Sequence, residues 1–491
     1  MLQNVIFNAL EFGATGDGIT LDSAAINAAL QECEAQGGGR VALPTGTYLC
    51  GPIQLRSNVN LHLEAGATVL FSRDFDHFPL CIASYEGQKT VQCRSPIWGE
   101  NLRDVSITGA GTFDGQGEAW RPVKRMKLSP DEWETLCRSG GAVDEARGIW
   151  WPSEAALRGE ATVRKLRSSG GAPRIADYEG ARDFLRPNMV QLTGCQSVTL
   201  DGPTFTNSPA WNVHLLLCED VVVRNCTILN PWFAQNGDGL DLESCRNVEV
   251  VDCTFDVGDD AICLKSGKDA EGRRRNRPCE AITIRRCTVL HGHGGVVVGS
   301  EMSGGVRDVR VEDCDFRGTD VGLRFKTCRG RGGIVENIDI RRVAMANIKG
   351  AAISFDMFYG GTAWGEGEAI SPRFEPVSEA TPQFRGVSIR DVTCEGAQVA
   401  IEMRGLPEMP IEAITIENMR VESERGVLLQ DARDISLREV QVVVPALPVL
   451  EIRNVGNLSV LNFSGQNHRA DEISSLGANP ASPNGNGQRH V

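Results

Sequence analysis

The stretch CRNVEVVDCTF, residues 245–255, recurs along the chain in altered form as Cys-x-x-Val-x-Val-x-x-Cys-x-Phe. Copies that keep the leading cysteine begin at Cys195, Cys218, Cys245 and Cys279. The first apolar position of successive copies falls at Val198, Val221, Val248, Ile282, Val309, Ile338, Val387, Ile414, Ile435 and Leu458. A second cysteine column follows at Cys226, Cys253, Cys287 and Cys314. The copies at Val221 and Val248 are 27 residues apart, a spacing typical of a solenoid repeat.

Each copy alternates apolar and polar residues, as in Val248-Glu-Val250. Alternation with period two is the pattern of a β-strand. A unit this short cannot bury its own apolar face, so consecutive units must stack, and the rest of each coil returns the chain to the next parallel strand. The sequence therefore predicts an all-β parallel β-helix in which the cysteine columns are buried ladders. A redox-sensor role for these thiols is the weaker alternative.

Three segments depart from the repeat. Residues 20–35 have helical periodicity and end before three consecutive glycines, which predicts a helix that caps the open end of the solenoid. Residues 115–190 hold the helix-like run SPDEWETL and a tryptophan pair, which predicts a partly helical insertion near the cleft. We expect one β-helix domain over residues 1–465 and a disordered tail over residues 466–491, which are rich in glycine, asparagine, serine and proline.

The composition excludes several classes of protein. Of 491 residues, 41% are hydrophobic and 23% are charged, which excludes wholesale disorder. The net charge is −14, so nucleic acid is not an expected partner. No apolar run approaches the ~20 residues of a membrane span, so no membrane partner is expected either. The first residues, MLQNVIFNALEFGATGDG, lack the features of a secretory signal. We therefore expect a cytoplasmic protein with reduced cysteines, or a secreted or periplasmic one if the N-terminus was trimmed.

Four short runs interrupt the repeat chemistry in successive units. They are Asn236-Gly237-Asp238, Asp259-Asp260, Gly292-His293-Gly294 and Arg324-Phe325-Lys326. When the apolar pairs of these units are aligned, Asp238 stacks on Asp260, and Asp259 shares a column with His293. Arg324 and Lys326 alternate with inward residues and therefore point outward. We expect three carboxylates, one imidazole and two cations to converge on one patch.

Such a patch suits a particular chemistry. Clustered carboxylates raise one another's proton affinity, so one can stay protonated while the others are ionised. That division suits a general acid beside a base-held water, as in glycoside hydrolysis. The two cations suit a substrate that carries a carboxylate, since arginine can bind one bidentately.

Each run has a commoner explanation when it is taken alone. Asn-Gly-Asp is more often a turn, paired aspartates are usually a solvated loop or a helix cap, and a glycine-flanked histidine is usually part of a turn. An Arg-x-Lys pair is usually an exposed strand face, and carboxylates near a coil turn can form a calcium site. These alternatives do not explain the shared register of all four runs in consecutive units.

Together the four runs resemble the motifs of glycoside hydrolase family 28, the polygalacturonases and related pectin hydrolases, which read NTD, DD, GHG and RIK in the same order. The resemblance covers roughly residues 8–460 and includes a right-handed parallel β-helix. It implies inverting hydrolysis without a metal or other cofactor. Gly237 replaces the usual threonine and Phe325 the usual isoleucine, and neither replaced side chain carries the chemistry in the family's pattern.

The resemblance also implies a role for each site residue. Asp259 would be the general acid, Asp238 and Asp260 would activate the water, and His293 would tune the acid and help to position the sugar. The residues that would contact the substrate are Asn236, Arg324, Lys326 and Tyr359.

The expected reaction is hydrolysis of α-1,4-galacturonosyl linkages in pectic polymer or oligogalacturonides. In members that resemble this chain, insertions like residues 115–190 accompany exo action, so we expect an exo-acting, bacterial-type enzyme that releases terminal galacturonate. An acidic protein must still attract a polyanion. We therefore expect a local basic patch made by Arg273, Arg274, Arg275, Arg277, Arg329 and Arg331, with an ordinary solvated loop as the alternative.

Other functions stay open at this point. A related pectic hydrolase could act on rhamnogalacturonan or xylogalacturonan. Less favoured are a calcium-dependent β-helix pectate lyase, which would need an arginine base and would release an unsaturated product, and a non-catalytic carbohydrate-binding or tailspike-like β-helix.

Overall fold

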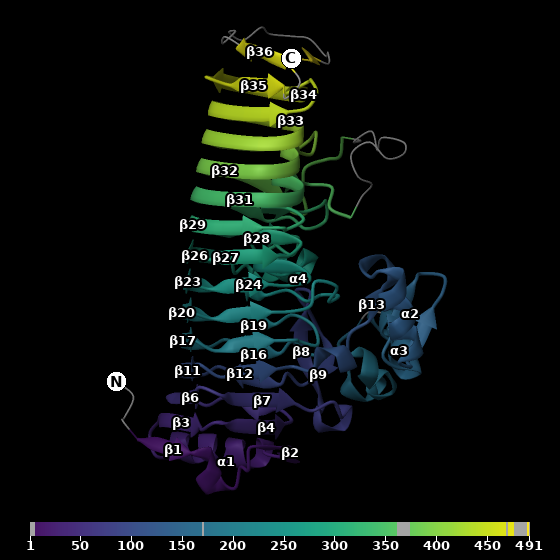
Figure 1. Cartoon of the computed structure of the whole chain (residues 1–491), viewed down its shortest axis with the longest axis vertical. Coiled ribbons are helices and arrows are strands. Elements are labelled where there is room, and N and C mark those ends of the chain that lie inside the picture. The colour runs from purple at the N-terminus through teal and green to yellow at the C-terminus, as the bar shows by residue number, and fades with distance from the viewer. Residues whose placement is uncertain (1–4, 169–170, 361–373, 468–469, 476–488, 491) are drawn as a thin grey trace. The chain divides into compact units, whose positions relative to one another are not determined.

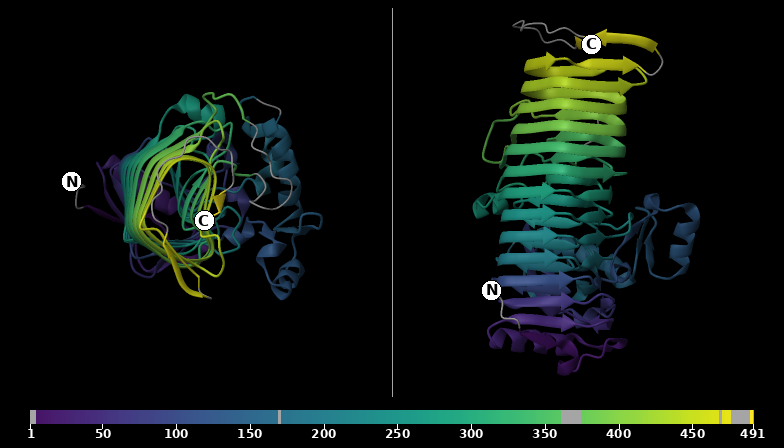
Figure 2. Two further views of the ribbon diagram at one scale, coloured as in Figure 1. Left: turned by 90° about the horizontal axis from the view of Figure 1, so that it is seen from above. Right: turned by 60° about the vertical axis from the view of Figure 1, so that its left-hand side comes forward.

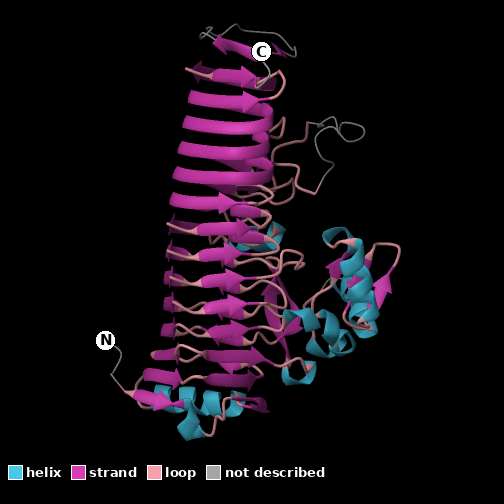
Figure 3. Ribbon diagram, viewed as in Figure 1, coloured by secondary structure: helices cyan, strands magenta, loops and turns pink. Residues whose placement is uncertain are grey.

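The computed structural model describes residues 5–168, 171–360, 374–467, 470–475 and 489–490. It consists of two compact units, Met1–Asp260 and Ala261–Val491, and each is described by itself. Strands dominate both units and helices are few (Figures 1 and 3). The strands pair in parallel from coil to coil, so the predicted all-β, right-handed parallel β-helix is confirmed.

The coils of the first unit are built from short strands. They are β1 (Ile6–Asn8), β2 (Asp17–Leu21), β3 (Gly39–Leu43), β4 (Gly46–Cys50), β5 (Ile53–Gln54), β6 (Val59–Leu63), β7 (Ala67–Phe71), β10 (Ile97–Glu100), β11 (Arg103–Gly109), β12 (Thr112–Asp114), β16 (Val190–Thr193), β17 (Gln196–Asp201), β18 (Thr204–Thr206), β19 (Val213–Leu216), β20 (Glu219–Arg224), β21 (Thr227–Leu229), β22 (Leu240–Glu243), β23 (Arg246–Val251) and β24 (Thr254–Asp256).

Parallel pairing holds equivalent residues of this unit in one column. Val198 of β17 pairs with Val221 of β20, which pairs with Val248 of β23, and all three are buried. The residue before each of these valines has a positive φ, for example 54° at Asn247. Asparagine tolerates this left-handed conformation, and the Asn247 amide donates a 2.6 Å hydrogen bond to the Asp220 carboxylate of the preceding coil. The turn therefore recurs at the same place in every coil of the column.

The N-terminal helix α1 spans Ser23–Ala35. It begins three residues later than the predicted 20–35, because Asp17–Leu21 forms strand β2. Its buried face holds Ile26, Ala29 and Leu30, and it packs against β3 and β5 at the end of the first unit. The predicted capping helix is present.

Two excursions leave the coils of the first unit. The hairpin β8 (Leu80–Tyr85) and β9 (Gln88–Cys93) lies between β7 and β10, and no pattern in the sequence predicts it. The longer insertion lies between β12 and β16. Its elements are η3 (Gly117–Ala119), β13 (Val123–Lys124), η4 (Arg125–Lys127), α2 (Pro130–Arg138), β14 (Ala142–Asp144), β15 (Ile149–Trp151), α3 (Glu154–Ser168), η5 (Ile175–Asp177) and η6 (Glu179–Phe184). This agrees with a partly helical insertion over 115–190.

The two excursions leave from equivalent positions. Strands β7 and β12 are neighbours in one column, with Leu70 opposite Asp114. The chain that follows each of them leaves the coil at the same edge. The column continues through β18, β21 and β24. Every loop that follows a strand of this column therefore emerges along one edge of the first unit.

The second unit continues with longer strands and one short helix. These are β25 (Asp260–Lys265), α4 (Asp269–Arg275), β26 (Cys279–Arg285), β27 (Thr288–His291), β28 (Gly294–Gly299), β29 (Val306–Arg317), β30 (Leu323–Lys326), β31 (Ile334–Asp356), β32 (Gln383–Arg404), β33 (Ile411–Val444), β34 (Leu450–Leu461), β35 (Ser464–Asn467), β36 (Ala470–Ser475) and β37 (Arg489–His490). In Figure 2 its green and yellow coils lie over one another.

The predicted apolar column also holds in the second unit. Ile282 pairs with Val309, and the column runs on through Ile338 to Val387 and Ile414. Val296 pairs with Leu323, as the aligned apolar pairs predict.

Two predictions about domain limits stay predictions. The single domain over residues 1–465 is not tested by the division into units. The predicted disordered tail falls mainly on residues 468–469, 476–488 and 491, which lie outside the described residues. The remaining residues of 466–491 belong to β35, β36 and β37.

All 16 cysteines are free thiols, and all except Cys137 and Cys328 are buried. Cys226 and Cys253 contact each other in the first unit, and Cys287 and Cys314 do so in the second. The predicted cysteine ladders are therefore present within each unit. Among the described residues, no helix has both the length and the apolar character needed to cross a membrane.

The buried thiols should resist alkylation. Burial raises the pKa of the Cys33 thiol to about 11 and that of Cys394 to about 12, so both stay neutral at pH 8. Because the thiolate is the reactive form, iodoacetamide at pH 8 should label Cys137 in the folded protein and Cys33 and Cys394 only after denaturation. Peptide mapping by mass spectrometry measures this order. Equal labelling of all three in the folded protein would contradict the burial of Cys33 and Cys394.

Candidate active site

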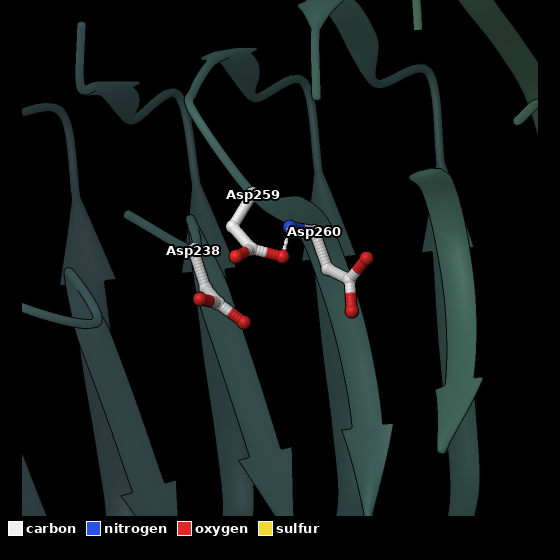
Figure 4. Close-up of side chains that lie close together, drawn as sticks. All are labelled: Asp238, Asp259 and Asp260. Atoms are coloured by element: carbon white, nitrogen blue, oxygen red, sulfur yellow. Dashed lines mark hydrogen bonds between the residues drawn. The ribbon is translucent and has the colours of Figure 1, made fainter. Parts of the chain in front are cut away.

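Three carboxylates lie together in the first unit. Oxygen atoms of Asp238, Asp259 and Asp260 all fall within 4.8 Å of one another (Figure 4). Asp238 is only 3% exposed and Asp260 only 2%, whereas Asp259 is half-buried. The trio thus combines two buried carboxylates with one that solvent, or a substrate, can reach.

The coil ladder positions Asp238 against Asp260. Asp238 lies two residues before β22, and its backbone carbonyl accepts a 3.0 Å hydrogen bond from the Asn212 amide. The next amide, Gly239 N, donates to the Asp260 carbonyl at 2.9 Å. These backbone contacts place the two aspartates on neighbouring coils, as the alignment of the repeats predicts.

Asp259 takes a different orientation from its neighbour. Its Oδ1 accepts a 3.0 Å hydrogen bond from the backbone amide of Asp260, the dashed line in Figure 4. This bond turns the Asp259 carboxyl toward Asp238. Three oxygens at such spacing can hold a proton, a water molecule or a hard cation between them.

Asn230 holds the loop that carries Asp238. Its amide group donates to the carbonyls of Gly237 at 3.1 Å and Asp238 at 3.3 Å, and its Oδ1 accepts from Ser208 N at 2.8 Å. Asn230 is buried. No pattern in the sequence marks this residue, because a single asparagine after a strand is too common to stand out.

Arg186 is a second residue of the site that no pattern in the sequence marks. This residue is 9% exposed and lies at the end of the insertion. Its guanidinium donates to Asn236 Oδ1 at 2.9 Å and to the Gln235 carbonyl at 2.8 Å. A second contact joins the insertion to the same loop, since the Lys127 ammonium lies 5.7 Å from the Trp232 ring centre. The insertion is therefore attached to the first motif.

Gly237 stands where the family's first motif usually has threonine, and this difference has a steric cause. A Cβ at this position would lie 2.6 Å from Ala234 Cβ. At Gly258 a Cβ would meet the Pro231 carbonyl at 2.5 Å. The loop over residues 230–237 is thus folded tightly against the aspartate motifs, and it leaves no room for the threonine that the resemblance leads one to expect.

The other predicted site residues lie in the second unit, where they also form one group. The ring of Tyr359 has the Lys326 ammonium 4.9 Å from its centre and the Arg324 guanidinium 5.7 Å from it. Arg324 also donates to the His293 carbonyl at 3.3 Å. His293 Nε2 lies 3.7 Å from a carboxylate oxygen of Asp320, and both side chains are partly exposed.

The predicted residues thus fall into two sets. Asn236 and the three aspartates lie in the first unit, except that Asp260 also begins the strand that continues into the second. His293, Arg324, Lys326 and Tyr359 lie in the second unit. The grouping inside each unit is observed, and the convergence of both sets on one substrate stays a prediction.

The expected basic patch is wrong for three of its arginines. Arg329 forms a bidentate ion pair with Glu408 at 2.6 and 2.9 Å. Arg273 donates to the carbonyls of Gly330 and Arg331 and forms an ion pair with Glu379 at 3.5 Å, and Arg331 itself pairs with Asp269. These cations hold the loops of the second unit together, so their charge is largely neutralised and is not displayed to a polyanion.

The aspartate trio is also the one group of three metal-ligating side chains found in the described part of the chain. Carboxylate oxygens are ligands that calcium and magnesium prefer. The absence of a metal from the reaction stays a prediction.

The chain resembles known proteins in sequence. Residues 177–437 match the family described as "Glycosyl hydrolases family 28", and residues 6–70 match "Rhamnogalacturonase A/epimerase, pectate lyase-like". A "Probable polygalacturonase" of Vitis vinifera is 31% identical over 84% of this chain and 73% of its own length. The "Exo-poly-alpha-D-galacturonosidase" of Dickeya chrysanthemi is 28% identical over 87% of this chain and 69% of its own.

Solved structures agree with the sequence comparison. The exopolygalacturonase of Thermotoga maritima superimposes with a TM-score of 0.73 at 29% identity, over 94% of this chain and 93% of its own.

The tight packing at Gly237 generates a prediction. Gly237→Thr should lower kcat about 10-fold or more, because the new Cβ displaces the loop that carries Asp238, and displacements of about 1 Å in an active site are costly. Adding Ala234→Gly removes the atom at 2.6 Å and should recover much of the loss. Steady-state kinetics of the two variants, with Ala234→Gly alone as the control, measure this. A fully active Gly237→Thr variant would contradict the steric explanation.

Proposed function

The chain belongs to glycosyl hydrolases family 28, and from this premise we propose that it hydrolyses galacturonan from the chain end and releases terminal galacturonate. It is a glycoside hydrolase. The observation that carries the proposal is the aspartate trio, in which one reachable carboxylate lies beside two buried ones.

The geometry supports a division of roles within the trio. Asp259, the half-buried member, gives its proton to the glycosidic oxygen as the bond from C1 to that oxygen breaks. Asp238 and Asp260, both buried, hold a water molecule and accept its proton as its oxygen bonds to C1. The products are a free sugar and a shortened chain, and the proton taken from water later restores Asp259.

Inversion at C1 rests on the family resemblance. The 4.8 Å within which one oxygen of each carboxyl lies is a distance between selected single atoms. It is not comparable with the separation of about 6.5–9.5 Å between carboxyl groups that is typical of inverting enzymes. The anomer that forms first in the reaction decides the matter.

We assign recognition of the galacturonate carboxylate to Arg324 and Lys326. Both lie against Tyr359, which offers an aromatic face for the sugar ring. His293 helps to position the sugar, and Asn236, held by Arg186, presents its amide to it. A rhamnogalacturonan or xylogalacturonan substrate is the alternative within the family. Rhamnogalacturonan alternates galacturonate with uncharged rhamnose, and xylogalacturonan carries xylose branches on a galacturonate backbone.

Exo action is supported by the insertion. Arg186 and Lys127 tie the insertion to the loop that carries Asn236 and Asp238. A cleft with such an obstacle at one side admits a chain end more readily than a chain interior.

We also propose that the protein works in a reducing compartment, the cytoplasm. The support is the chemistry of its thiols, since all 16 cysteines are free and several are stacked in contact. Fractionation of cells tests the location.

The acid role of Asp259 gives a clear test. Asp259→Asn should lower kcat on polygalacturonate by about 10²–10⁴-fold with a smaller change in KM, since general acid catalysis contributes about that much. Reducing-sugar release measures the rate, and Asp256→Asn, on the preceding strand, is the matched control. Full activity of Asp259→Asn, or an unsaturated product that requires calcium, would refute the hydrolase mechanism.

The product pattern tests exo action. Early in the digestion of polygalacturonate, galacturonate should be the dominant product, and the viscosity of the polymer should fall slowly. Anion-exchange chromatography identifies the products, and proton NMR of the first minutes should show the β-anomer if C1 is inverted. Mixed long oligomers would refute exo action, and an initial α-anomer would refute inversion.

A further inference from the structure

Tyr359 lies in a short turn of the second unit, three residues after strand β31 ends at Asp356. Its backbone amide donates to the Thr327 carbonyl at 3.0 Å. The amide of Met357, at the start of the turn, donates to the Arg404 carbonyl at 3.0 Å. The Tyr359 side chain is nevertheless 39% exposed. The backbone of the turn is therefore held, whereas the direction of the tyrosine ring depends on the side chains that pack around the turn.

Phe358, the residue before the tyrosine, is half-buried and contacts two guanidinium groups. Arg329 Cζ lies 5.5 Å from the centre of its ring, and Arg404 Cζ lies 5.3 Å from it. Both distances are within the ~6 Å at which a cation is attracted to an aromatic face. The Phe358 amide also donates to Asp356 Oδ1 at 2.9 Å. Because one peptide bond joins Phe358 to Tyr359, the place where Phe358 packs limits where the tyrosine ring can lie.

Acidic side chains hold both arginines in place. Arg329 donates to the two carboxylate oxygens of Glu408 at 2.6 and 2.9 Å, and the Glu408 side chain is only 1% exposed. Such a two-point contact fixes the plane of a guanidinium as well as its position. Glu375 lies 3.7 Å from Arg329, and Asp356 lies 3.7 Å from Arg404. The arginines are thus oriented against the Phe358 ring while acids neutralise their charge.

We propose that a clamp formed by Phe358, Arg329 and Arg404 positions Tyr359 for the uronate substrate. The proposal rests on the proposed function, in which the tyrosine ring faces the sugar. The two cations assigned to the substrate carboxylate also lie against the Tyr359 ring, so a displaced ring would disturb all three contacts with the sugar. Arg329 and Arg404 are therefore positioning residues, which act on the substrate through Phe358 and Tyr359 and not through their own charge.

Glu408→Gln tests whether Arg329 acts by its position or by its charge. The variant keeps the shape of the side chain and removes the carboxylate that orients the guanidinium. It should raise KM for trigalacturonate about 3- to 30-fold, the size expected when a contact between a cation and an aromatic ring is lost. The change in kcat should stay below about twofold, because only substrate binding is weakened. A role in attracting the polyanion predicts the opposite, a lower KM, since the variant releases a cation.

Arg329→Lys keeps the charge but cannot make the two-point contact, so it should raise KM as much as Glu408→Gln does. Phe358→Leu should do the same, whereas Phe358→Tyr keeps the aromatic face and should behave like the wild type. Arg385→Lys is the matched control, because Arg385 also donates twice to a glutamate, Glu336, at 2.9 and 2.7 Å, but lies on strand β32. Thermal unfolding checks that each variant is folded.

A double-variant cycle separates positioning from a direct contact with the substrate. When Tyr359→Ala has already removed the ring, Arg329→Lys should change KM no further, because the two residues act as one unit. If Arg329 itself touched the sugar, the same substitution would still raise KM in the Tyr359→Ala background.

The outcomes distinguish this proposal from the proposed function. If wild-type enzyme hydrolyses no galacturonan, the proposed function fails and the role of the clamp fails with it. If wild-type enzyme is active but Glu408→Gln lowers KM or leaves it unchanged, or if the effects of Arg329→Lys and Tyr359→Ala simply add, only the clamp is overturned. A rise in KM that disappears in the Tyr359→Ala background supports it.

Discussion

Parallel backbone pairing between consecutive coils is the constraint on which everything else in this protein depends. Because each strand pairs in register with its equivalent in the next coil, an apolar column such as Val198, Val221 and Val248 stacks in the buried interior. The same pairing sets the spacing of residues that lie at equivalent turns. Asp238 and Asp260 are 22 positions apart along the chain, and yet the ladder puts them on adjacent coils.

In the first unit, the loops that carry the site residues all leave the coils along one edge. Strands β7, β12, β18, β21 and β24 form a single column. The hairpin β8–β9 follows the first of them, the insertion follows the second, the loop with Asn236 and Asp238 follows β21, and Asp259 follows β24. A turn at the edge of a coil can lengthen without disturbing the ladder, because backbone pairing resumes on the next strand. The solenoid thus keeps a rigid set of strands while its loops carry the specificity.

Repeat and site differ in how far the sequence predicts them. The repeat could be read because each unit shows the same apolar and cysteine positions, and the coils stack those positions directly. The grouping of Asp238, Asp259 and Asp260 followed from the same alignment. The hairpin β8–β9, the loop contacts of Asn230 and the contact of Arg186 with Asn236 did not, because contacts between excursions have no period. The basic patch failed for a related reason: Arg329 has an acidic partner, Glu408, that is 79 residues away along the chain.

The sequence by itself determined the class of fold, the column that each apolar residue joins and the order of the four motifs, since these depend on periodicity and on local chemistry. Only the tertiary structure decided that Ala234 leaves room for nothing larger than glycine at position 237. It also decided that Arg186 joins the insertion to the first motif, and that Gln92 of the hairpin and Trp151 of the insertion line one pocket. The physical reason is that backbone hydrogen bonds repeat with the coil, whereas side-chain packing between irregular loops depends on where each loop leaves the coil and how it folds back.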